Sequence, residues 1–167
     1  MHPQIAPLCE IATLNSRLFL DALEEVTDEQ ARQRPAGVAN SMVFVALHLL
    51  DARCYLARML GAEASHPYEK ELEAVQSIDE MQEFPALEDV RAAWREASSS
   101  LDRALRELTA ERLIEKAPAE FPVEDRSTLG GVAFLLQHES FHIGQLALLR
   151  RQVGLGSMGY RDVMGKR

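Results

Sequence analysis

The segment Leu129–Leu149, LGGVAFLLQHESFHIGQLALL, combines an apolar helical pattern with two histidines, His138 and His142. Residues four apart lie on one face of an α-helix, so the two imidazoles are predicted to stand one above the other. At about 100° per residue they share a stripe with apolar residues and with Gln145, and this stripe is expected to face the interior. The spacing suits two ligands of one metal ion, but core histidines satisfied by hydrogen bonds produce the same pattern.

The composition is typical of one globular domain covering residues 1–167, with 47% hydrophobic and 26% charged residues. No apolar run is long enough to span a bilayer, and Met1–Gln4 does not resemble a signal peptide, so we expect a cytoplasmic protein without a membrane partner. The net charge of −8 argues against a nucleic-acid partner. Cys9 and Cys54 belong to no C-x-x-C motif and are expected to be free, packed thiols.

The rest of the chain also shows helical periodicity. Three more long helices are predicted, over about Ile5 to Val26, Met42 to Leu60 and Leu87 to Leu108. The fourth long helix, which carries His138 and His142, begins at Ser127 or Thr128 and continues to about Val153. Thr27 and Gln30 fit a capping box that opens a short additional helix. A long acidic connection, residues 62–84, joins the second and third long helices, and its His66 is expected to be exposed. The fold class predicted is therefore all-α, a four-helix bundle.

A third histidine, His48, lies near the middle of the second long helix. Alone it would be interpreted as structural, but beside His138 and His142 it completes a set of three imidazoles. Three neutral ligands with an open position are typical of a catalytic zinc site rather than a closed structural one. Imidazole also binds nickel, copper and iron, so the residues predict a divalent transition metal without selecting it.

The sequence His138-Glu139-x-x-His142 also matches the motif of zinc proteases, in which two histidines bind zinc and the glutamate is the general base. Such proteases take a further protein ligand from later in the chain. After His142 this chain has neither histidine nor glutamate, and Asp162 is its one carboxylate side chain. A protease is therefore not expected.

The order of these motifs resembles the DinB-like (YfiT-like) superfamily of metal-binding four-helix bundles. That family has a histidine in the second long helix and a His-x-x-x-His pair in the fourth, often followed by Gly-Gln, which here corresponds to His48, His138, His142 and Gly144-Gln145. The resemblance implies an up-down-down-up bundle, zinc or nickel on the three histidines, and a homodimer. It also implies a small-molecule substrate and, as in characterised relatives, a low-molecular-weight thiol.

Two catalytic routes are compatible with this site. A metal can lower the pKa of a thiol, for transfer to an electrophile, or of water, for hydrolysis. Glu139 is the candidate to accept a proton, or it is a solvated helix residue; Gln145, Asn15 and Asp51 are candidates to orient an imidazole. The function predicted is a metal-dependent thiol transferase; a hydrolase, or a non-enzymatic metal-binding or interaction bundle, is the alternative.

Overall fold

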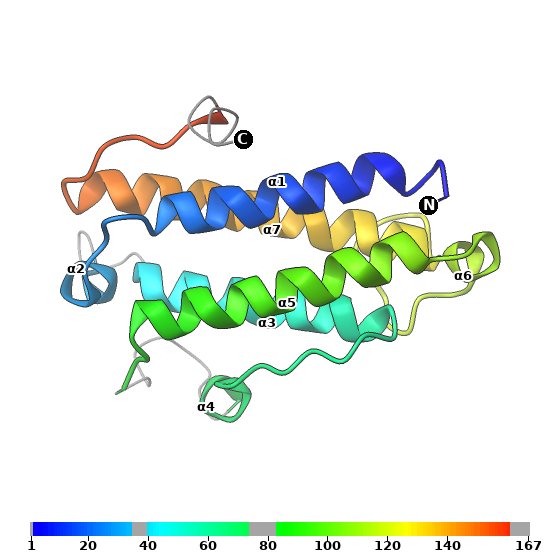
Figure 1. The fold of residues 1–167 in the computed structure, drawn as a ribbon, viewed down its shortest axis with the longest axis horizontal. Coiled ribbons are helices and arrows are strands. Elements are labelled where there is room, and N and C mark those ends of the chain that lie inside the picture. Colours follow the sequence, from blue (N-terminus) through cyan, green and yellow to red (C-terminus); the bar gives the residue numbers. More distant parts are fainter. Residues whose placement is uncertain (1, 35–39, 74–82, 161–167) are drawn as a thin grey trace.

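The computed structural model describes residues 2–34, 40–73 and 83–160, and these residues form an all-α bundle (Figure 1). Within them, the β structure is one isolated bridge between Lys116 and Ser127. The predicted fold class is thus confirmed. The helices are α1 (Ala6–Ala22), α2 (Asp28–Arg32), α3 (Met42–Met59), α4 (Glu69–Glu73), α5 (Leu87–Glu107), α6 (Ala110–Ile114) and α7 (Thr128–Gln152).

The four long helices α1, α3, α5 and α7 run up, down, down and up, as Figure 1 shows. Each packs against two others: α1 and α3 both contact α5 and α7. Helices α3 and α5 run in the same direction, and the described start of the connection between them, which carries α4, runs back along the bundle. As a result α3 and α7, the two helices that carry the candidate ligands, are antiparallel neighbours.

Local capping explains where these helices begin and end. The Ser41 hydroxyl accepts a hydrogen bond from the backbone N–H of Phe44 at the start of α3, and Gly61 follows its end with φ +89. Both halves of the capping box predicted at Thr27 and Gln30 are present. The predicted long helices agree closely with the observed ones, except that the first ends at Ala22 rather than Val26. The short helices α4 and α6 were not predicted.

The core consists of two clusters of apolar side chains stacked along the bundle axis. One contains Trp94, whose ring stacks on Phe19 with centroids 3.9 Å apart; the other contains Leu101 and Leu136. Cys9 and Cys54 are free and buried, as expected. Among the described residues, no helix combines the length and the apolar character that crossing a bilayer requires.

Candidate metal centre

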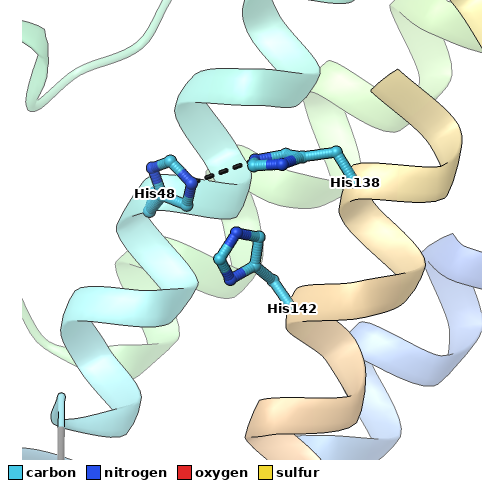
Figure 2. Close-up of side chains that lie close together, drawn as sticks. All are labelled: His48, His138 and His142. Carbon is cyan, nitrogen blue, oxygen red and sulfur yellow. Dashed lines mark hydrogen bonds between the residues drawn. The ribbon is translucent and has the colours of Figure 1, made fainter. Parts of the chain in front are cut away.

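His48 of α3 and His138 and His142 of α7 meet in one group between the two helices (Figure 2). One ring nitrogen from each lies within 4.8 Å of the others. The Nε2 atoms of His48 and His138 are 3.0 Å apart, and the ring of His142 lies beside both, with centroids 4.7 Å from His48 and 4.4 Å from His138. The structure therefore brings together the three predicted ligands.

This geometry fits a small divalent ion. Two nitrogens each about 2.0–2.1 Å from one tetrahedral ion are separated by about 3.3 Å. The Nε2 atoms of His48 and His138 are close to that separation already, and a ring nitrogen of His142 lies within 4.8 Å of the ligand atoms of both. All three donors come from one pair of helices, which can hold an ion from one side and leave a coordination position for another molecule.

Two of the three rings are disposed to be neutral. Burial, and then the charges of His142 and His138, lower the pKa of His48 from 6.5 to about 4. Burial also lowers the pKa of His138, followed by the effect of His142, while the Glu139 carboxylate acts in the opposite direction. A neutral imidazole is the form that binds a metal, so protons compete weakly for these ligands at neutral pH.

Gln145 contacts one of the rings. Its Oε1 atom lies 2.7 Å from Nδ1 of His142, on the next turn of α7. The amide oxygen can only accept, so Nδ1 carries the proton and Nε2 keeps its lone pair for a metal. This is the contact expected of the predicted orienting residue.

The stripe predicted to face the interior is rotated in the structure. The buried face of α7 includes Val132, Leu135 and Glu139, whereas His138 and His142 are half-buried. Because the histidines lie at the edge of that face rather than at its centre, they stand at the boundary between core and solvent. A site in this position is partly exposed to solvent.

Glu139 occupies the centre of the bundle with 0% of its surface exposed, so the interpretation of a solvated helix residue is wrong. Its carboxylate forms an ion pair with Arg53, which is also fully buried. A role for Glu139 as proton acceptor stays a prediction. The sequence analysis missed Arg53, although a lone base in the apolar segment 42–57 and a lone acid in Leu129–Leu149 together signal such a pair.

The other candidate orienting residues do not contact an imidazole. Asn15 is buried on α1, and its Nδ2 donates to Glu139 Oε2 at 3.3 Å and to the carbonyl of Leu136 at 3.1 Å. Asp51 is half-buried one turn after His48, and it makes no hydrogen bond to any of the described histidine rings. Gln145 is therefore the residue of the three that contacts a candidate ligand, and its orienting role stays a prediction.

His66 is 5% exposed, which corrects the expectation of an exposed loop residue. Its Nδ1 accepts a hydrogen bond from the backbone N–H of Tyr68 at 3.0 Å, so Nε2 is the atom that donates to the carbonyl of Leu47 at 3.4 Å. The ring thus fastens the α3–α5 connection to the backbone of α3. This is a structural role, separate from the three-histidine group.

Aromatic side chains flank the group on α7. The ring of Phe134 lies 6.0 Å from that of His138, and the ring of Phe141 lies 5.1 Å from that of His142. Phe141 is 59% exposed. An ion held by the histidines would therefore have apolar surface beside it.

The sequence profile of the DinB superfamily matches residues 13–146, whereas a comparison with curated proteins found no match. A DinB-like protein from Bacillus cereus is similar in structure, with 20% sequence identity and a TM-score of 0.69, over 91% of this chain and 94% of that one. A conserved protein from Enterococcus faecalis has 15% identity and a TM-score of 0.68, over 92% and 98% of the two chains. Because the profile match includes most of the chain and the candidate ligands, the chain belongs to the DinB superfamily.

Proposed function

We propose that the protein binds one zinc or nickel ion through His48, His138 and His142 and uses it to transfer a small-molecule thiol to an electrophilic substrate. The observation that carries this proposal is the cluster of three imidazoles, with one ring nitrogen of each within 4.8 Å of the others. The preference for a thiol comes from the resemblance to the DinB-like family and from the affinity of soft thiolate ligands for zinc.

The chain's own residues supply binding and orientation. His48, His138 and His142 are neutral ligands, so a divalent ion would keep its positive charge. Such an ion lowers the pKa of a coordinated thiol into the neutral range. Gln145 holds the ring of His142 in the tautomer that leaves Nε2 available.

The proposed reaction is the transfer of a thiol sulfur to an electrophilic carbon. The sulfur forms a bond to an electrophilic carbon, the leaving group departs with the bonding electrons, and the thiol proton passes to solvent. Phe134 and Phe141 give the electrophile an apolar surface beside the site. We therefore propose a substrate that joins an electrophilic centre to an apolar group.

The first experiment measures metal content. Elemental analysis of protein purified without chelators or immobilised metal should find one zinc or nickel per chain, and the metal-free protein should take up either ion at neutral pH. His66→Gln is the matched control, because His66 is a buried histidine outside the three-histidine group, and this variant should keep its metal. Protein that takes up no metal would contradict the proposal.

The second experiment separates the reaction classes. Bacillithiol, mycothiol, glutathione and cysteine are added in turn to cobalt-substituted protein, and at least one should produce sulfur-to-cobalt charge-transfer bands. If no thiol changes the spectrum and a carboxylate or phosphate ester is hydrolysed, the protein is a hydrolase. If neither occurs and a fourth protein ligand closes the coordination sphere, it is a non-enzymatic metal-binding bundle.

A further inference from the structure

The centre of the bundle holds a buried ion pair between the same two helices that carry the histidines. Arg53 of α3 donates from Nε to Glu139 Oε1 at 2.8 Å and from Nη2 to Oε2 at 2.5 Å. Both side chains are only 1% exposed. Two parallel bonds between a planar guanidinium and a carboxylate form only in one relative orientation, so this contact constrains geometry as well as charge.

The pair is also bonded to the other two long helices. Nη1 of Arg53 donates to the hydroxyl of Ser16 on α1 at 2.5 Å and to that of Ser98 on α5 at 3.0 Å. The guanidinium lies 4.0 Å from the ring centroid of Trp94, also on α5. Asn15 of α1 donates to Glu139 Oε2. One polar network therefore connects α1, α3, α5 and α7.

This network lies at the junction of the two apolar core clusters. On α1, Ala12 belongs to one cluster and Leu18 to the other, with Asn15 and Ser16 between them. The same change of cluster occurs around Ser98 on α5, around Glu139 on α7 and next to Arg53 on α3. The bundle thus contains one polar layer at a single level.

Stability alone does not account for a buried charged layer. Removing two charges from water is costly, and apolar residues of similar volume often give equal or greater stability. Apolar surfaces, however, tolerate sliding and rotation, whereas the bidentate pair does not. What the layer adds is a defined register between helices.

That register matters at the histidines. Glu139 directly follows His138 and precedes His142 by three residues, and Arg53 follows His48 by five. A shift of α7 by one residue relative to α3 would move its side chains by about 1.5 Å along the axis and by about 100° around it. Either displacement would separate the Nε2 atoms of His48 and His138, which now lie 3.0 Å apart.

We propose that Arg53 and Glu139 are positioning residues, which fix α7 against α3 so that His48 meets His138 and His142 at metal-binding distance. Neither side chain is proposed as a ligand. This inference rests on the proposed function in one respect only, namely that the three histidines bind a metal.

The test uses the double variant Arg53→Met/Glu139→Leu, which removes both charges and keeps side-chain volume. We expect it to fold with a Tm at or above those of the two single variants, because neither charge remains unpaired. We also expect its zinc Kd, measured by competition with a chromophoric chelator, to be at least about 10-fold weaker than wild type. The d–d bands of cobalt-substituted protein should change as well, since the ligand geometry relaxes.

Leu101→Ala is the matched control, because Leu101 is a buried α5 residue in the core cluster that does not include Leu47 and Leu49, the chain neighbours of His48. It should lower Tm and leave the zinc Kd within about 2-fold of wild type. A purely structural role for the ion pair predicts the reverse pattern, in which zinc affinity follows Tm in both variants. A double variant with wild-type Kd and cobalt spectrum would overturn the proposal.

Two further measurements cover other results. If the double variant does not fold, Arg53→Lys is used instead, because it keeps the charge but loses the bidentate guanidinium contact. At an equal loss of Tm, Arg53→Lys should weaken zinc binding more than Leu101→Ala does. An equal effect of the two substitutions on zinc binding would overturn the proposal. A crystal structure of the metal-free double or Arg53→Lys variant should show the Nε2 atoms of His48 and His138 farther apart than 3.0 Å. This readout needs no metal, so it distinguishes failure of the positioning role from failure of the proposed function.

Discussion

The Nε2 atoms of His48 and His138 lie 3.0 Å apart, in a hydrogen bond between two antiparallel helices. One of the two nitrogens must carry the proton of that bond. Metal binding requires both lone pairs, so the proton has to move to the Nδ1 atom of the same ring or leave. The metal-free contact thus already holds two ligands together, and a cation would take the place of one proton between them.

Loss of one ligand should affect metal binding more than folding. His138→Ala removes a half-buried ring from the edge of the core, and the apolar clusters that stabilise the bundle remain. We expect a wild-type far-ultraviolet circular dichroism spectrum with tight zinc binding lost. An unfolded variant would instead identify the site as a structural staple, which weakens the case for an enzyme.

Gln145 should contribute to metal affinity through His142. Gln145→Ala removes the acceptor that lies 2.7 Å from Nδ1, so the ring loses its fixed tautomer and orientation. A zinc titration should show a Kd about 10-fold weaker. Gln137→Ala is the control, because Gln137 is an exposed residue of the same helix and type. Equal effects of the two substitutions would argue against the orienting role.

The stability of the metal-free protein should decrease as the pH falls from about 6.5 to about 4. Burial lowers the pKa of His48 to about 4 in the folded protein, whereas an exposed histidine titrates near 6.5. In this window the unfolded chain binds a proton that the folded protein does not, so acid favours unfolding. Above pH 6.5 His48 is neutral in both the folded and the unfolded protein, so its titration no longer lowers the free energy of unfolding. Urea unfolding at several pH values should show a shallower pH dependence for His48→Gln than for wild type; identical slopes would contradict the assignment.

The two cysteines should be unreactive in the folded protein. Burial raises the pKa of Cys54 to about 11 and also raises that of Cys9, so little thiolate is present at neutral pH. A disulfide reagent such as Ellman's reagent should label neither thiol rapidly under native conditions and both after unfolding. Rapid labelling of the native protein would indicate that α1 or α3 opens locally.

Two glycines of α7 should respond oppositely to alanine. A Cβ atom at Gly130 would lie 2.2 Å from the backbone oxygen of Asp125, so Gly130→Ala must displace the segment before the helix. We expect a loss of about 1–3 kcal/mol of unfolding free energy. Gly144 has nothing within 4 Å of that position, and Gly144→Ala should gain up to about 1 kcal/mol. Chemical denaturation measures both; a neutral Gly130→Ala would contradict the close approach.

The amino-acid sequence by itself determined the helices and the identity of the candidate ligands. Helical periodicity and capping are local properties, so the start of α3 at Met42 and the capping box at Thr27 could be predicted directly. The histidine spacing within α7 is likewise local. The contact of His48 with this pair is not local, because it requires a bundle in which α3 and α7 are neighbours. The order of the motifs along the chain indicated such a bundle.

The tertiary structure alone decided which polar residues are buried and what satisfies them. Arg53 and Glu139 are 86 residues apart in the chain, and although each is a lone charge of its sign in an apolar segment, only the packing of α3 against α7 brings them into contact. His66 is buried for a similar reason, since its acceptor is a carbonyl of α3, outside its own loop. The periodicity of α7 also placed the histidines at the centre of the buried face, whereas its packing against α1 and α3 gave that position to Glu139. An amphipathic pattern predicts the buried face of a helix only to within the width of its apolar stripe. The rotation of the helix about its own axis within that range is set by packing against the neighbouring helices.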